Sequence, residues 1–95
     1  MRIEWSSEAQ EELWSIIDYI DDRNPRAVRK LQHEIEAVVP SLPLNPLMHR
    51  LGRVDNTREI VVHPNYLIVY RIIGHIEVLS VIHAKREYPR IKNPG

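Results

Sequence analysis

Apolar residues recur at helical spacing in the first part of the chain. Over residues 7–22 and again over residues 25–39, apolar positions lie three and four residues apart, with charged residues between them. This period predicts two amphipathic helices. Asn24 and Pro25 lie between them, and because Asn is a favoured N-cap and Pro is tolerated at the first helical position, the second helix should begin there. We therefore expect a helical hairpin over about residues 7–39.

Two further local signals predict where these helices begin and end. Ser7 and Gln10 have the spacing of a capping box, in which each side chain bonds the backbone amide of the other residue, so Ser7 should cap the first helix. Pro40 should end the second helix, because proline lacks an amide donor and disfavours helical backbone in the residue before it. A loop punctuated by prolines then runs to about residue 48.

Beyond this loop the pattern changes to that of strands. Three segments are rich in Val, Ile, Tyr and Leu, which favours a β-meander over about residues 57–83. A two-residue hairpin turn is expected at Gly74 and His75. The predicted strands cover residues 57–62, 66–73 and 76–82, with a short N-terminal strand at 2–5 and an extra short edge strand within 49–54. The fold class is therefore α+β: a helical hairpin packed on one face of a mostly antiparallel sheet.

The composition indicates one small globular domain spanning residues 1–95. With 43% hydrophobic and 27% charged residues the chain can bury a core, which argues against disorder. No apolar run approaches the roughly 20 residues that span a membrane. The absence of cysteine excludes thiolate chemistry and disulfides and suits the reducing cytoplasm, where we expect the protein. Neither a nucleotide-binding glycine loop nor a histidine cluster occurs, so we expect no cofactor and no metal.

The formal net charge is zero, but the charges are unevenly distributed. Residues 1–24 carry two basic and seven acidic residues, whereas the tail over residues 84–95 is basic. A basic tail favours contact with an acidic partner or with phosphate. The tail residues expected to make such contacts are Lys85, Arg86, Arg90 and Lys92.

Polar residues around the last predicted strand could form a ribonuclease site. Cleavage through the 2′-hydroxyl needs a base, an acid and a cation that stabilises the charged phosphorane. Histidine is a residue type that can act as an acid or a base, which makes His83 a candidate, and Arg86 or Arg58 could hold phosphate. Tyr88 could donate a proton or stack on a base. The alternative is structural: His83 ends a strand and satisfies a backbone group, while Arg86 pairs with a nearby carboxylate. The residue types leave both interpretations open.

Two long segments resemble the RelE/ParE superfamily of toxins from type II toxin–antitoxin systems. Residues 57–71 read TREIVVHPNYLIVYR, and residues 78–89 read VLSVIHAKREYP. Residues 5–20 also look like the first helix of that superfamily. The resemblance covers nearly the whole chain and implies the same order of elements as the hydrophobic pattern.

The resemblance divides between two branches with different functions. RelE-like toxins cleave mRNA in the ribosome, whereas ParE-like toxins poison DNA gyrase and are not nucleases. In the nuclease branch a catalytic arginine precedes the Leu-Val-Tyr of the central strand, and here Leu67 occupies that position. Arg50 and Arg53 are sparse substitutes for the lysine-rich strand of the nucleases, although Arg86 matches one of their basic positions. The resemblance therefore favours a ParE-like toxin that inhibits gyrase by protein contact and has no catalytic residues.

The resemblance also implies a cognate antitoxin, usually encoded beside the toxin, which typically wraps the toxin with a helix and with a strand added to an edge of the sheet. We expect the apolar side of the helical hairpin to bind it, through Leu13, Ile17, Ile20, Leu31 and Ile35. The basic tail would then contact gyrase or its DNA. In the alternative, a RelE-like endonuclease, the target is the ribosome with its mRNA and the candidate catalytic residues are His83, Arg86, Tyr88 and Arg58. A second alternative is an inactive module that binds the antitoxin and does not affect growth.

Overall fold

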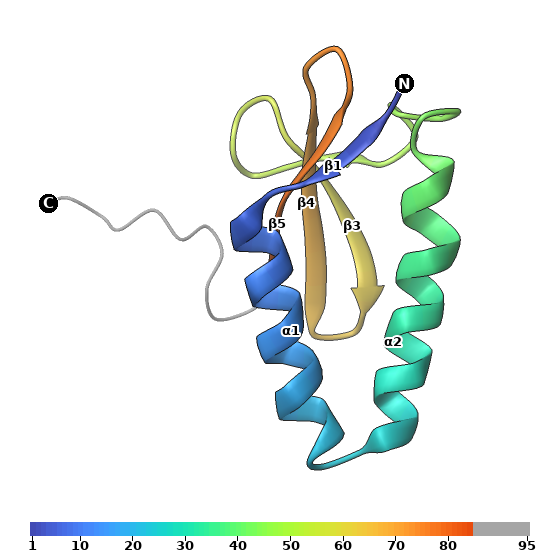
Figure 1. Cartoon of the computed structure of the whole chain (residues 1–95). Helices are drawn as coiled ribbons and strands as arrows, with labels where there is room; N and C mark the ends of the chain where they lie inside the picture. Colours follow the sequence, from blue (N-terminus) through green and yellow to red (C-terminus); the bar gives the residue numbers. More distant parts are fainter. Residues whose placement is uncertain (85–95) are drawn as a thin grey trace, which may run out of the picture.

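A helical hairpin covers one face of a five-stranded sheet (Figure 1). The computed structural model describes residues 1–84. The strand order across the sheet is β1-β5-β4-β3-β2, and only the β1–β5 pair is parallel. The predicted α+β architecture is confirmed, including the short edge strand. In chain order the elements are β1 (Ile3–Trp5), α1 (Ser7–Asp21), α2 (Pro25–Val38), a 3-10 turn (Val39–Ser41), β2 (Arg50–Leu51), β3 (Arg58–His63), β4 (Tyr66–Ile72) and β5 (Ile76–His83).

The N-cap of α1 is Ser6, so the prediction that Ser7 caps this helix is wrong. The Ser6 hydroxyl oxygen accepts a hydrogen bond from the Ala9 amide at 3.0 Å. Gln10 reaches back to the carbonyl that precedes Ser6 and makes no capping box with Ser7. The amide and the hydroxyl of Ser6 also donate to two consecutive carbonyls of β5, at 3.0 Å each. These contacts with the sheet select Ser6 as the cap.

The start of α2 is as predicted. The Asn24 side-chain oxygen accepts a hydrogen bond from the Ala27 amide at 3.3 Å, and Pro25 is the first helical residue. The helix ends at Val38, and the 3-10 turn that follows contains Pro40. The hairpin therefore lies where the sequence placed it, because both signals act within a few residues of the chain.

The main hydrophobic core fills the space between the hairpin and the sheet. Helical residues three, four or seven apart point toward the strands, and alternate residues of β3, β4 and β5 point toward the helices, as the two periods require. Leu13, Ile16 and Ile17 are partly buried against this core. Its most buried members include Ala9, Leu31, Leu42, Ile60, Ile68, Tyr70, Ile76 and Val78.

A second, smaller apolar cluster lies on the other face of the sheet. It consists of Leu67, Val69 and Ile82, which are almost fully buried, with Leu79 and Ala84 packed against them. Adjacent strand residues point to opposite faces, so this cluster and the main core share β4 between them. This alternation gives β4 two apolar faces.

The turn between β4 and β5 is one residue longer than predicted. The strands are separated by residues 73–75, and the Ile73 amide donates to the His75 carbonyl at 2.9 Å. Gly74 has a φ of 82°, which is the left-handed region that glycine adopts without steric cost. This local hydrogen bond removes Ile73 from the ladder of the sheet, so β4 ends at Ile72.

Candidate functional site

His83 lies at the end of β5, beside the acidic side of α1. Its ring contacts the Tyr66 ring edge to face, with centroids 5.4 Å apart. Both rings line a cavity of about 560 Å³ whose other wall carries carboxylates of α1. Those carboxylates belong to Glu8, Glu11 and Glu12. A negative rim of this kind repels the phosphates of a nucleic acid.

Arg58 occupies the far end of the same face and is engaged by a loop. It pairs with Tyr70 on β4, whereas His83 pairs with Tyr66. Four residues along a strand correspond to roughly 13 Å, so the two side chains do not share a site. The Arg58 Nη1 donates to the carbonyls of Leu47 and His49, at 3.2 and 2.6 Å. The Arg58 guanidinium therefore binds the loop before β2, and this contact takes the place of the phosphate contact that a nuclease site would need.

The phenol of Tyr70 anchors the same loop. Its Oη donates to the Pro46 carbonyl at 2.7 Å, and the side chain is fully buried. Burial raises the pKa of Tyr70 above its usual value, while the charge of Arg58 acts in the opposite direction. The phenol consequently stays protonated at neutral pH and remains a hydrogen-bond donor.

The face of the sheet opposite the helices presents apolar residues at its centre. Leu67, the position at which the resemblance placed the arginine of the nuclease branch, belongs to the buried cluster with Val69 and Ile82. A charged side chain at this position would be buried among aliphatic groups. Without an oppositely charged partner, its burial would cost roughly several kcal/mol of stability. Among residues 1–84, the centre of this face provides no cation for phosphate.

A buried carboxylate that the sequence analysis missed lies beside this cluster. Glu59 pairs with Val69 across the strands and its side chain is 2% exposed. Its Oε1 is 3.0 Å from Arg50 Nη2, and its Oε2 accepts a hydrogen bond from the Arg53 amide at 3.0 Å. The Arg53 Nε lies 3.8 Å from the same oxygen. The signal in the sequence was an acid inside an apolar strand, preceded by two arginines.

An apolar groove of about 540 Å³ runs between α1 and α2 on their outer side. Of the residues predicted to bind the antitoxin, Leu13, Ile17 and Ile35 line it. Ile20 and Leu31 do not: they are buried in the core and point toward the sheet. Ile35 is itself largely buried, so it contributes only to the floor of the groove.

Trp14 is the most exposed apolar residue of this groove. Its side chain is 66% exposed, and it lies one residue beyond Leu13 on the outer side of α1. The pattern of apolar residues does not predict Trp14 as a binding residue, because Trp14 falls outside the apolar stripe that faces the core. An aromatic residue off the core stripe of an amphipathic helix was the available signal.

The remaining predicted site residues lie outside the described part of the chain. They are Lys85, Arg86, Tyr88, Arg90 and Lys92. Within residues 1–84 no group of three or more His, Asp or Glu side chains is placed to hold a metal ion. The helices of this part are too short and too polar for one of them to cross a membrane.

Comparison with known proteins gives consistent matches over most of the chain. Residues 3–88 match the family described as the ParE toxin of the type II toxin–antitoxin system parDE. The candidate toxin Y4kP of Sinorhizobium fredii is 35% identical over 91 residues, which is 95% of each chain.

Solved structures share the fold at lower identity. The chromosomal ParDE toxin–antitoxin system from P. aeruginosa matches with a TM-score of 0.74 and 22% identity, over 87% of this chain and 95% of that one. A YoeB/ParE toxin from Agrobacterium tumefaciens matches with a TM-score of 0.61 and 13% identity, over 87% and 98% of the two chains. The order of elements, the helical hairpin on the sheet and the family match agree, and the chain belongs to the ParE toxin family of type II toxin–antitoxin systems.

Proposed function

We propose that this toxin inhibits DNA gyrase by protein contact and does not cut RNA. The observation that carries the proposal is the burial of Leu67 in an apolar cluster. By resemblance, this is the position at which the nuclease branch has its catalytic arginine. The separation of His83 from Arg58, and the use of Arg58 by the loop carbonyls, support it. Membership of the ParE family points the same way.

The target can be identified with two assays on the same purified protein. One measures supercoiling of plasmid DNA by purified gyrase, and the other measures cleavage of mRNA bound to ribosomes. We expect loss of supercoiling with trapped, cleaved DNA, and intact mRNA. Cleavage of mRNA with unchanged gyrase activity would overturn the proposal and identify a nuclease. Absence of both effects would identify an inactive module.

The basic tail is the proposed contact with gyrase or its DNA. Its cations, Lys85, Arg86, Arg90 and Lys92, are concentrated in a short segment of a chain with no net charge. The double variant Arg86→Glu with Arg90→Glu should lose inhibition of supercoiling. A matched control makes the same charge change on the exposed side of α2, with Arg26→Glu and Arg29→Glu. Equal inhibition by both double variants would remove the tail from the mechanism.

The groove between α1 and α2 is the proposed site for a helix of the antitoxin. Its apolar lining by Leu13 and Ile17, with Trp14 exposed beside them, fits the apolar face of an amphipathic helix. Large aromatic side chains at such positions commonly dominate binding energies. The partner covers apolar surface that the small core of the toxin leaves exposed.

A further inference from the structure

The segment that leads from α2 into β2 concentrates exposed apolar side chains. Nine large apolar side chains are exposed among residues 1–84, and four of them lie within residues 44–51. These four, which we call the apolar loop, are Leu44, Leu47, Met48 and Leu51, and they are between 65% and 84% exposed. Single exposed apolar side chains are common on proteins, but four within eight residues indicate a binding surface.

The backbone of the apolar loop is held by side chains of the sheet. The Tyr70 Oη donates to the Pro46 carbonyl at 2.7 Å, and the Arg58 Nη1 donates to the carbonyls of Leu47 and His49 at 3.2 and 2.6 Å. Three carbonyls within four residues are therefore fixed from below. A loop that is already ordered loses little conformational entropy when a partner binds, so its exposed side chains are preorganised for contact.

The apolar loop is separate from the groove proposed for the antitoxin. In Figure 1 the segment after α2 lies at the end of the molecule opposite the turn between α1 and α2. None of the four apolar residues lines the groove between the two helices. The two surfaces can therefore be altered independently of each other.

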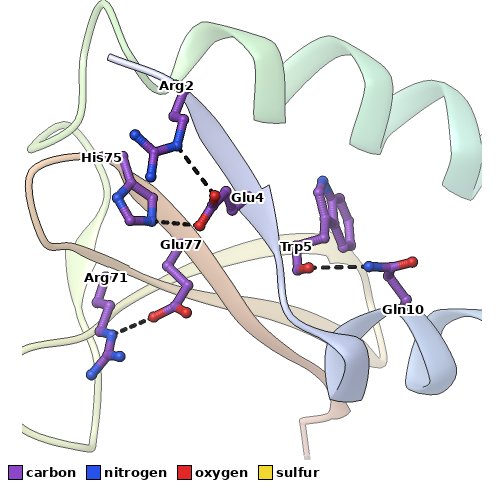
Figure 2. Close-up of polar contacts among 7 residues, drawn as sticks. All are labelled: Arg2, Glu4, Trp5, Gln10, Arg71, His75 and Glu77. Atoms are coloured by element: carbon purple, nitrogen blue, oxygen red, sulfur yellow. Dashed lines mark hydrogen bonds and ion pairs between the residues drawn. The ribbon is translucent and has the colours of Figure 1, made fainter.

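The charged groups of the strands at this end of the sheet pair with one another, as Figure 2 shows. Glu4 lies 3.2 Å from the Arg2 Nε and 3.0 Å from the His75 Nε2. The Arg71 Nε lies 2.6 Å from Glu77. These charges are balanced within the chain, whereas the side chains of the apolar loop remain in water. The loop is thus the part of this end that gains most from being covered.

The charges beside the apolar loop are all positive. Residues 42–54 contain Arg50, Arg53 and His49 and no acidic residue. The two arginines share one buried carboxylate, that of Glu59, and keep 56% and 45% of their side-chain surface exposed. Two cations against one anion leave one positive charge. The complementary surface is therefore apolar at its centre and acidic at its rim.

This combination fits a protein better than the other possible occupants. A nucleic acid offers phosphates to the arginines but no apolar recess to four aliphatic side chains. A membrane-binding loop usually carries Trp or Tyr at the interface, and residues 42–54 contain neither. The basic tail of the chain has the same sign of charge as this region and is repelled by it.

We propose that the apolar loop is the surface with which the toxin grips its target protein, at an apolar recess rimmed by carboxylates. The inference rests on the proposed function, which makes gyrase that target. Leu47 and Met48 are the anchors that enter the recess, and Arg50 and Arg53 face its rim. The loop would supply apolar contact with the protein, which the cations of the tail cannot supply.

Removal of the two anchors tests the loop. The measurement is the toxin concentration that halves supercoiling by purified gyrase, and Leu47→Ser with Met48→Ser should raise it about thirtyfold. Ile73→Ser removes an exposed apolar side chain from the turn between β4 and β5 and should change it by less than about twofold. Both variants should keep the circular dichroism spectrum of the wild type and its rise in Tm with antitoxin.

The outcomes separate this inference from the proposed function. A wild type that leaves gyrase unaffected overturns the proposed function and this inference with it. A wild type that inhibits gyrase, with equal inhibition by the double variant, overturns this inference alone. Three results in which the double variant differs from the wild type would give the loop another occupant and also overturn it. They are loss of the rise in Tm with antitoxin, loss of a toxin dimer, and loss of binding to vesicles that contain phosphatidylglycerol.

A charge pair at one position tests the acidic rim. Asn45 is exposed within the loop, and its printed hydrogen bonds use only the backbone, so its side chain can be replaced without breaking them. At low salt Asn45→Glu should raise the half-inhibitory concentration about fivefold, whereas Asn45→Lys should leave it equal or lower. The difference should shrink as salt is added. Equal effects of the two variants, or the reverse order, would overturn the proposed acidic rim.

Discussion

At the scale of single residues, Glu59 joins the edge strand β2 and the loop after it to β3. Its carboxylate is almost completely removed from water, which is costly for a charge. The cost is offset by Arg50 at 3.0 Å and by the side chain and amide of Arg53. Both arginines keep about half of their side-chain surface in water, so only one member of the network is strongly desolvated. Glu59 thereby ties β2 and the loop after it to β3.

Replacing the Glu59 carboxylate by an amide should lower the stability of the fold. Glu59→Gln keeps the size and loses the charge, and we expect it to lower the free energy of unfolding by about 2 kcal/mol, the usual scale for hydrogen bonds to a charged group. Glu77→Gln is the control, because Glu77 pairs with Arg71 at 2.6 Å near the surface and should cost less than about 1 kcal/mol. Urea denaturation of both variants measures the difference. Equal losses would contradict the role given to Glu59.

His63 should make the stability of the fold depend on pH. Burial and then the charge of Lys30 lower its pKa in the folded state, and its Nδ1 accepts a hydrogen bond from the Asn65 amide at 3.0 Å. The unfolded chain therefore binds the proton more readily. This contribution is present above the unfolded pKa of about 6.5 and is lost as the pH falls through 6.5 toward the folded value.

The sign of this effect can be tested by substitution. Between about pH 7.5 and about pH 5.5, the His63→Gln variant should lose less stability than the wild type, as measured by urea midpoints. Lys30→Gln should lie between the two, because it removes only the smaller cause. Identical pH dependence of His63→Gln and the wild type would show that this histidine does not contribute.

At the scale of elements, α1 is joined to the sheet at its first turn. Ser6 connects the start of the helix to two carbonyls of β5, and Glu12 reaches the Val81 amide two turns later. Both contacts link residues about seventy positions apart in the chain, which no local pattern specifies. They orient the helix so that Ala9 enters the core and Trp14 faces solvent.

Two neighbouring serines distinguish the observed cap from the predicted one. Ser6→Ala should lower the free energy of unfolding by about 1–2 kcal/mol, because it removes the acceptor for the Ala9 amide and a donor to β5. Ser7→Ala, at an exposed position in the first turn, should change it by less than about 0.5 kcal/mol. Thermal unfolding of both variants measures the difference. A larger loss of stability for Ser7→Ala would show that Ser7 is the cap, as the capping box predicted.

At the scale of the whole molecule, the small domain is expected to gain stability from its antitoxin. A ligand that binds only the folded state at about 100 times its dissociation constant stabilises it by about 2.7 kcal/mol, which corresponds to a rise in Tm of roughly 10 °C for a chain of this size. Differential scanning fluorimetry with the purified antitoxin measures this rise. An unchanged Tm at saturating antitoxin would contradict the pairing.

The groove between the helices should carry much of this binding. Trp14→Ala should reduce the rise in Tm to about a third at the same antitoxin concentration, as expected when about 2 kcal/mol of binding is lost. Tyr19→Ala is the control, since Tyr19 is an exposed aromatic residue of the same helix that stacks with Arg23 away from this groove. Equal effects of both variants would place the helix of the antitoxin elsewhere.

The sequence by itself determined the elements and their order. Helical and strand periods are properties of consecutive residues, so they predicted the hairpin and the meander. The Asn24 cap and the Pro40 stop are equally local. The family followed from long matching segments, since their residues are read in order along the chain.

Tertiary structure decided everything that depends on groups distant in sequence meeting in space. It chose Ser6 over Ser7 as a cap, separated His83 from Arg58, and turned Ile20 toward the sheet while leaving Trp14 in the groove. The apolar stripe of a helix does not determine which of its residues are buried against the sheet, because the rotation of the helix about its axis depends on the elements that it packs against. The edge of β3 also depends on tertiary structure. Within residues 1–84 no strand pairs with Val61 on that side, because β2 pairs only with the first two residues of β3.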